Sequence, residues 1–282
     1  MEKGVLYIVS TPIGNLKDIA LRAIETLKSV DFIASEDTRT SQILLNKLNI
    51  TSFSTNTKLI SYHKFNEKSR VSYFLDLLNN GKNIALISDA GTPCICDPGR
   101  ILINHLLQEE IKIIPIPGPC AFVTFLSAVQ KEDENFVFLG FLPRQDNKQT
   151  DLFKQYCSID LLFYESPNRV LNTLENIAKS RSNNTLVSIG RELTKIHEEI
   201  LTLNVIDMIK YFNDKKIKGE FVILVHKDNT ESSDNQEDDI LIKNHILKLK
   251  AQNFSNKDIS VILSSLYNLN KNKIYKMSLT LN

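Results

Sequence analysis

The 282-residue chain lacks the compositional marks of a secreted, fibrous or disordered protein. It contains four cysteines, nine glycines and eight prolines, and 42% of its residues are hydrophobic. Four cysteines in this length are too few for a disulfide framework, which argues against a secreted protein. The low glycine and proline content, combined with ample apolar residues, excludes a disordered or fibrous chain.

The chain also lacks a long uninterrupted apolar run. The longest one, Ile111–Val129, contains Lys112 and three prolines, which exclude a membrane-spanning helix. The five apolar residues Val5–Val9 are too few for the core of a signal peptide. We therefore expect a cytoplasmic protein that has no membrane partner.

Charge is nearly balanced over the whole chain but is unevenly distributed near its C-terminus. The chain has 34 Lys+Arg against 33 Asp+Glu. Segment 227–239 has one Lys and six acidic residues, whereas segment 240–282 has seven Lys and one Asp. The sequence predicts an acidic linker and then a basic segment, which either faces nucleic acid or is only a solvated helical appendage.

Residues 1–117 alternate short apolar runs with segments of helical periodicity. The runs lie at 4–10, 32–34, 59–62, 83–88 and 112–116. They do not alternate apolar with polar residues, so we expect strands of a mostly parallel sheet that is covered on both faces. Between them, helical spacing occurs at 16–30 and around 43–48, and Asn66 could cap a helix that ends at Gly81.

Residues 118–226 carry more strand and less helix than the first domain. We expect helices at 121–129 and 168–179, and strands at 136–141, 161–164, 186–189, 196–203 and 220–225. This mixture predicts a second α/β domain with a mixed sheet. Segment 240–282 predicts two or three helices, with a turn rich in capping residues at 255–258.

Three loops after the expected strands are candidates for ligand binding, because open α/β sheets bind ligands at the carboxyl ends of their strands. Loop 10–15 (STPIGN) leads into a helix and lacks the GxGxxG of dinucleotide-binding folds. Loop 88–99 (SDAGTPCICDPG) is the strongest candidate, since glycine permits close backbone approach and its acids could meet a cationic ligand or ribose hydroxyls. Segment 115–121 (PIPGPCA) is a rigid hinge that could contact the same ligand. A purely structural role is the alternative for each of these loops.

Four polar clusters follow other expected strands. They are Glu36–Arg39, Tyr62–His63 with Asn66 and Glu67, Glu165–Arg169, and Arg191–Lys195. Taken together they indicate a common polar cleft, although each one alone is more typical of a helix cap or a surface ion pair. Cys94 and Cys96 have no matching Cys or His pair at zinc spacing, so we expect them to serve in packing and expect no metal.

Eight motifs, in order, resemble one family over nearly the whole chain. They are LYIVSTPIGNLKDI, ASEDTR, SYHKFNE, ISDAGTPCICDPG, IPGPCA, LGFLPR, FYESPNR and GRELTKIHEE. They are similar to the bacterial small-subunit ribosomal RNA (cytidine-2′-O)-methyltransferases of the tetrapyrrole-methylase superfamily. The resemblance implies two α/β domains with S-adenosylmethionine in the cleft between them, and a homodimer. It also implies methylation of a cytidine 2′-hydroxyl in the decoding region of 16S ribosomal RNA in the small ribosomal subunit.

The resemblance further implies which residues hold the methyl donor and which surround the acceptor. The donor set is Pro12, Ile13, Gly14, Asn15, Asp89, Ala90, Gly91, Thr92, Pro93, Ile95, Gly118, Cys120, Ala121, Glu165 and Glu192. The acceptor set is Glu36, Asp37, Arg39, His63, Glu165, Arg191 and Lys195. Within it, the three cations are expected to hold phosphate, and a carboxylate or His63 is expected to take the proton.

Two other functions stay open. A small-molecule, tetrapyrrole-type methyltransferase would share the donor cleft but need no basic tail. The chain lacks the glycine-rich first loop and the Gly-Asp-Pro of the tetrapyrrole enzymes, which argues against a porphyrinoid substrate. A non-enzymatic RNA-binding module would keep the basic tail and tolerate loss of Glu165 and Arg191.

Overall fold

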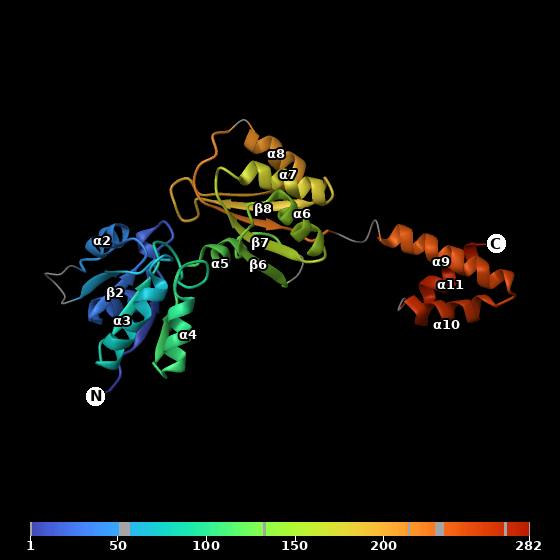
Figure 1. Ribbon diagram of the computed structural model, residues 1–282. Helices are drawn as coiled ribbons and strands as arrows, with labels where there is room; N and C mark the ends of the chain where they lie inside the picture. The colour runs from blue at the N-terminus through green and yellow to red at the C-terminus, as the bar shows by residue number, and fades with distance from the viewer. Residues whose placement is uncertain are drawn as a thin grey trace. The chain divides into compact units, whose positions relative to one another are not determined.

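The computed structural model describes residues 2–50, 57–131, 134–213, 215–228, 234–267 and 270–281 (Figure 1). The chain divides into two compact units, Met1–Lys227 and Asp228–Asn282. Both β-sheets belong to the first unit. No helix in the described ranges combines the length and the apolar character that crossing a membrane requires.

The first sheet has five strands in the order β3-β2-β4-β1-β5, and every pairing is parallel. This arrangement confirms the predicted parallel sheet of the N-terminal domain. The strands are β1 (Leu6–Val9), β2 (Phe32–Ser35), β3 (Lys58–Ser61), β4 (Ile84–Ile87) and β5 (Ile113–Ile116).

Helices cover both faces of this sheet, because successive strand residues point to opposite sides. Helices α1 (Leu21–Ser29) and α2 (Thr38–Lys47) pack on the face that includes Val9 and Ile33. Helices α3 (Glu67–Asn79) and α4 (Arg100–Gln108) pack on the face that includes Leu6 and Leu86. A short 3-10 helix, η1 (Leu16–Asp18), precedes α1. The domain is therefore doubly wound, as predicted.

The second sheet is mixed, which confirms the other half of the predicted fold class. Its strand order is β6-β7-β10-β8-β9, and β6 and β7 form its parallel pair. Helix α5 (Ala121–Leu126) packs on one face, and α6 (Asp146–Gln155), α7 (Val170–Ser180) and α8 (Val205–Asn213) cover the other (Figure 1). The strands are β6 (Phe136–Phe141), β7 (Asp160–Glu165), β8 (Leu186–Arg191), β9 (Glu199–Asn204) and β10 (Phe221–Val225).

The expected cap of α3 is wrong in its detail. Asn66 occupies the N-cap position, but its side chain makes no capping hydrogen bond. Its Oδ1 instead accepts from the His63 backbone N–H (2.8 Å), and its Nδ2 donates to the Ser61 carbonyl (3.2 Å). The side chain therefore fixes the turn before the helix. At the other end, Gly81 has φ +75° directly after the C-cap Asn80, as expected of a helix terminator.

The second unit contains α9 (Asp234–Ala251), α10 (Asn256–Tyr267) and α11 (Lys271–Thr280). They share a small core that includes Ile246, Ile259 and Ile274. Helix α9 begins inside segment 227–239, which the sequence suggests is an acidic linker. The expected capping turn is present, because Ser255 Oγ accepts from the backbone N–H of Asp258 (3.2 Å).

Candidate functional site

A cavity of about 390 Å³ lies in the first unit, where loops at the carboxyl edge of the parallel sheet meet the second sheet. It contains many of the residues that the sequence predicts for a ligand site. Those that line it are Ile13, Glu36, Asp89, Ala90, Gly91, Thr92, Ile95, Cys120, Ala121 and Glu165. The predicted residues outside the lining are Pro12, Gly14, Asn15, Asp37, Arg39, His63, Pro93, Gly118, Arg191, Glu192 and Lys195.

About half of the lining stands outside the predicted donor and acceptor sets. These residues are Cys96, Asp97, Phe141, Tyr164, Ser166, Pro167, Leu193, Gly219, Glu220, Phe221 and Val222. Asp97 is one of the two acids of loop 88–99 that the sequence proposes for a cationic ligand, and Ser166 lies within the motif FYESPNR. Residues 219–222 belong to no motif and reach the cavity because β10 pairs with β7, with Phe221 opposite Glu165.

The three predicted binding loops are joined to one another. The backbones of Thr11 and Gly91 exchange two hydrogen bonds of 2.9 and 3.1 Å. Thr92 Oγ1 donates to the Pro119 carbonyl (3.1 Å) and lies 2.9 Å from Ser10 Oγ. Gly91 has φ +83°, a conformation that glycine adopts without strain. Loops 10–15, 88–99 and 117–120 therefore form one continuous wall.

Three carboxyl groups line the cavity on this side. Asp89 and Asp97 come from loop 88–99, and Glu36 directly follows β2. Partial burial raises the pKa of each, and the negative charges of the neighbouring carboxylates add to the shift. His63 acts in the opposite direction on the pKa of Glu36. Among the described residues, no Lys or Arg forms an ion pair with any of the three. The wall is acidic and suited to a cationic ligand.

Asp37 has a different environment from its neighbour Glu36. It is the N-cap of α2, and its carboxylate accepts from the Arg39 backbone N–H (2.9 Å) and pairs with the Arg39 guanidinium (2.8 Å). Hydrogen bonds from Arg39 lower the pKa of Asp37 to about 2. The backbone N–H of Asp37 also donates to Asp89 Oδ1 (3.2 Å). Asp37 therefore anchors the loop, while Arg39 extends into solvent with 89% of its side chain exposed.

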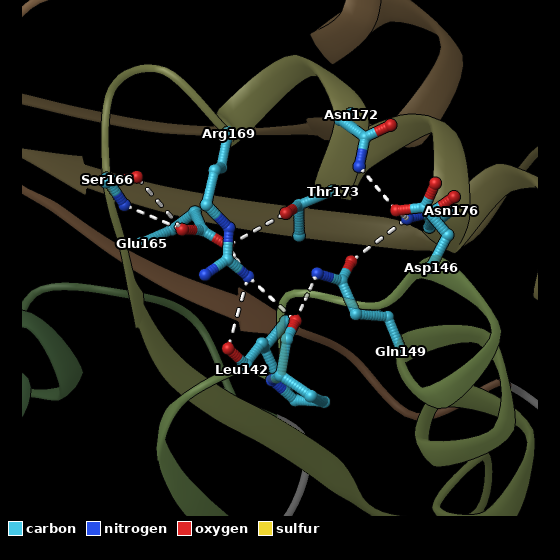
Figure 2. A network of polar contacts seen from close by, with 10 residues as sticks. Leu142, Asp146, Gln149, Glu165, Ser166, Arg169, Asn172, Thr173 and Asn176 are labelled. Atoms are coloured by element: carbon cyan, nitrogen blue, oxygen red, sulfur yellow. Dashed lines mark hydrogen bonds and ion pairs between the residues drawn. The ribbon is translucent and has the colours of Figure 1, made fainter.

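Glu165 lines the cavity, but its carboxylate is occupied by donors from its own domain (Figure 2). Oε1 accepts from the Ser166 backbone N–H (2.7 Å), and Oε2 accepts from Thr173 Oγ1 (2.8 Å) and pairs with Arg169 (3.2 Å). Arg169 in turn donates to the Leu142 carbonyl (3.2 Å). Glu165 therefore fixes the cavity segment 165–167 to α7 and to the loop after β6.

This network continues away from the cavity to the start of α6 (Figure 2). Asn176 Nδ2 donates to Asp146 Oδ1 (3.0 Å) and to Gln149 Oε1 (3.0 Å), and Gln149 Nε2 donates to the Pro143 carbonyl (2.8 Å). Gln149 is fully buried, so these bonds satisfy a polar side chain that would otherwise destabilise the domain. The motifs LGFLPR and FYESPNR are thus held together by one set of polar contacts.

Glu192 and Lys195 lie in the turn after β8 and join it to Glu220 at the start of β10. Lys195 Nζ pairs with Glu192 Oε1 (2.8 Å) and Glu220 Oε2 (3.2 Å), and the Glu220 backbone N–H donates to Glu192 Oε1 (3.1 Å). The Lys195 ammonium holds the pKa of Glu192 below its usual value. A Cβ on Gly14 would lie 3.0 Å from the Leu193 carbonyl oxygen, so the first loop packs directly on this turn. Lys195 therefore stabilises the junction of the two sheets.

Arg191 and His63 also lie behind the lining. Arg191 Nε donates to the Lys218 carbonyl (2.8 Å), and its guanidinium pairs with Glu199 (3.5 Å). His63 Nδ1 is buried without a hydrogen-bond partner in the described part of the chain. Neither Arg191 nor Lys195 lines the cavity, and their role in holding phosphate stays a prediction.

Burial disfavours the thiolate form of the two cysteines of loop 88–99. Burial raises the pKa of Cys94 to about 12 and that of Cys96 to about 11. Cys94 packs against the core beneath α3 and α4. No group of three or more His, Cys, Asp and Glu side chains in the described ranges is arranged to hold a metal ion.

The fold defines the class of protein. The family model of tetrapyrrole (corrin/porphyrin) methylases matches residues 5–208. A cobalt precorrin-4 methyltransferase of cobalamin biosynthesis superposes with a TM-score of 0.60 at 17% identity, over 79% of this chain and 94% of that one. The uroporphyrin III C-methyltransferase of Thermus thermophilus gives a TM-score of 0.56 at 11% identity, over 79% and 97%. At such identities the structures establish the fold alone.

Sequence relatives narrow the class. A protein of Hydrogenobaculum named ribosomal RNA small subunit methyltransferase I is 45% identical over 229 residues, which is 80% of this chain and 96% of that one. The protein of the same name from Vibrio cholerae is 37% identical over 279 residues, or 98% and 94%. The chain therefore belongs to the tetrapyrrole methylase family and, within it, to the ribosomal RNA small subunit methyltransferase I group. It is a methyltransferase.

Proposed function

We propose that this protein transfers the methyl group of S-adenosylmethionine to the ribose 2′-hydroxyl of a cytidine in small-subunit ribosomal RNA. The observation that carries the proposal is the acidic cavity at the junction of the two sheets. Its wall is built from the same loops that resemble the donor-binding motifs. The names of the two relatives described above support ribosomal RNA as the acceptor.

The residues of the cavity fit this donor. A volume of about 390 Å³ is within the usual range of cofactor pockets. Ile13, Leu193 and Val222 offer apolar surface to an adenine ring, and the carboxylates can face a sulfonium or accept from ribose hydroxyls. A bound donor supplies a methyl carbon that the sulfonium makes electrophilic. Gly91 has φ +83°, a backbone conformation that residues with a Cβ rarely adopt, so this part of the wall requires glycine.

Glu36 is the proton acceptor that the geometry favours. Of the other acidic candidates, Asp37 has its pKa lowered to about 2, which makes it a weak base, and the carboxylate oxygens of Glu165 already accept hydrogen bonds from Ser166 and Thr173. Glu36 lines the cavity, and its pKa is raised, which strengthens it as a base. Glu36 takes the proton of the 2′-hydroxyl as the oxygen gains the methyl group and the carbon–sulfur bond breaks. His63, the remaining candidate base, does not line the cavity, so we propose Glu36 as the proton acceptor.

Binding of the ribosomal subunit depends on cations outside the cavity. Arg39 extends from the rim, and the exposed lysines of the second unit add a sequence-independent attraction to phosphates. These lysines are Lys243, Lys248, Lys257, Lys271 and Lys276. Replacing all five with Gln should raise KM for subunits and flatten its salt dependence, while donor affinity stays unchanged. An unaltered salt dependence would remove the second unit from the binding surface.

We also expect a homodimer that acts in the cytoplasm, as the family resemblance implies. Sedimentation equilibrium of the purified chain tests the dimer directly. A monomer that still methylates subunits would contradict the proposed homodimer but not the proposed reaction.

The reaction itself is tested with labelled S-adenosylmethionine and unmodified small ribosomal subunits. We expect label in the RNA, with one ribose in the decoding region becoming resistant to alkaline cleavage. Label in a base, in protein or in several scattered riboses would contradict the proposed acceptor. Turnover on a free tetrapyrrole, with none on subunits, would favour the small-molecule alternative.

A further inference from the structure

We infer that Phe65, flanked by Lys64 and Lys68, forms a stacking platform for an unpaired RNA base next to the methylated nucleotide. This inference rests on the proposed function and names a recognition surface for its substrate. None of the three residues belongs to the predicted donor or acceptor sets.

Phe65 places a large apolar ring in solvent on a well-fixed turn. Its side chain is 95% exposed. The His63 carbonyl accepts from the backbone N–H groups of Asn66 and Glu67 (3.0 Å each), and the His63 N–H donates to Asn66 Oδ1 (2.8 Å). The backbone of this turn is therefore already fixed, so stacking on the ring requires little reorganisation of the chain. Its edge-on contact with His63, at 6.1 Å between centroids, leaves most of the ring open.

The turn lies beside the cavity because β2 and β3 are neighbours in the parallel sheet. Ser35 pairs with Ser61, and the Tyr62 N–H donates to the Ser35 carbonyl (2.8 Å). Glu36 and His63 therefore follow adjacent strand ends, and the charge of His63 acts on Glu36. Phe65 is two residues further along. A base stacked on Phe65 would therefore belong to a nucleotide close to the one whose ribose meets Glu36.

The charges around Phe65 favour RNA over a protein partner. Lys64 and Lys68 are exposed, and no carboxylate of the described residues pairs with either. Lysines are depleted at the centre of protein interfaces, whereas an aromatic ring interleaved with cations is typical of single-strand binding sites. Sequence-specific RNA recognition commonly uses splayed bases stacked on aromatic side chains.

The test compares F65A, F65L and F65W in the full chain, with L107A as the matched control. Leu107 is also exposed (60%), but it lies near the C-terminal end of α4, at the opposite edge of the sheet. For F65A we expect a roughly tenfold rise in KM for small subunits, with kcat within twofold and donor affinity unchanged. F65L should resemble F65A, because it keeps apolar bulk without a flat ring. F65W and L107A should resemble the wild type.

Three results would overturn the inference. One is a KM for F65A equal to that of the wild type. Another is F65L behaving as the wild type, since apolar bulk alone would then suffice. The third is a change of oligomeric state in F65A by sedimentation, which would assign the ring to a contact between copies. Failure of the wild-type protein to methylate subunits is separate, because it would reject the proposed function and this inference with it.

Discussion

The two walls of the cavity use acidic residues in opposite ways. On the wall built by the parallel sheet, Glu36, Asp89 and Asp97 have no cationic partner in the described structure, and their pKa values are raised. On the wall built by the mixed sheet, Glu165 is held by Arg169, and behind this wall Glu192 is held by Lys195. The first set is available to a ligand, and the second set maintains the shape of the site.

This difference shows that the partners of a carboxylate decide its role more than its place at a strand end. All five carboxylates lie close to strand ends, where ligands of α/β sheets bind. An unpaired, partly buried carboxylate weakens the fold but retains its capacity to accept a proton or face a cation. The variants below test whether the carboxylates of the first wall act on the ligand and those of the second wall maintain the shape of the site.

The largest effect is expected for E36Q, which removes the proton acceptor on the parallel-sheet wall. The rate of a single turnover on small subunits should fall 10²–10⁴-fold, roughly the contribution of a general base. Donor affinity by calorimetry should change little, because the amide is isosteric with the carboxyl group. D37N is the matched control and should retain most activity, since the Asp37 side chain caps α2 and pairs with Arg39 but does not line the cavity. A single-turnover rate of E36Q close to that of the wild type would show that another residue is the general base.

E165Q should affect stability instead of chemistry. The change weakens the charged contact with Arg169 but preserves the oxygen that accepts from Ser166. We expect the free energy of unfolding to fall by about 1.5–3 kcal/mol, the range for hydrogen bonds to charged groups. Turnover per folded molecule should stay within a few-fold of the wild type. Unchanged stability in urea, together with a large loss of turnover, would contradict this assignment.

K195M should weaken donor binding a few-fold, because the turn after β8 loses the ion pairs of Lys195 with Glu192 and Glu220. The partly exposed pairs limit the cost to about 1 kcal/mol or less. Calorimetry with S-adenosylmethionine measures the change. K210M is the matched control, because its ion pair with Asp207 is exposed on α8 and should not influence the donor. Equal donor affinity in both variants would show that Lys195 does not support the site.

The smallest effect is expected in the pH dependence of stability for D97N. A raised pKa in the folded state means that folding binds protons between the ordinary pKa of Asp, about 4, and the raised one. The free energy of unfolding of the donor-free wild type should therefore fall as pH rises through that window. D97N should lose less stability over the same range and bind the donor more weakly. Parallel melting curves for the two proteins from pH 4 to 7 would contradict a raised pKa at Asp97.

Much of the fold could be predicted from the sequence, because buried strands leave strong apolar signals. The run 136–141 coincides with β6, and the runs at 83–88 and 220–225 contain β4 and β10. Helix α6 escaped prediction because its sequence, DNKQTDLFKQ, is polar and its buried face includes Gln149. That face is recognisable only when Asn176 and the Pro143 carbonyl are in place to bond it.

The sequence could predict the loops that form the parallel-sheet wall of the site, but not the wall that the mixed sheet forms. Loops 10–15 and 88–99 carry glycine, proline and acid signatures that indicate ligand contact from local sequence. Phe221 and Gly219 carry no such signature and depend on the antiparallel pairing of β10 with β7. The sequence also could not distinguish Glu36 from Glu165, since the difference lies in which donors surround each carboxylate.

The most direct test of the role of Glu36 on the parallel-sheet wall is the pH dependence of single-turnover methylation by the wild type and E36Q. The wild-type rate should rise with pH through an apparent pKa above the usual value for glutamate, because only the ionised carboxylate accepts the proton. That limb should vanish in E36Q, whose residual rate should be flat over the same range. An identical limb in both proteins would show that another group controls the reaction, and the account of the parallel-sheet wall would be wrong.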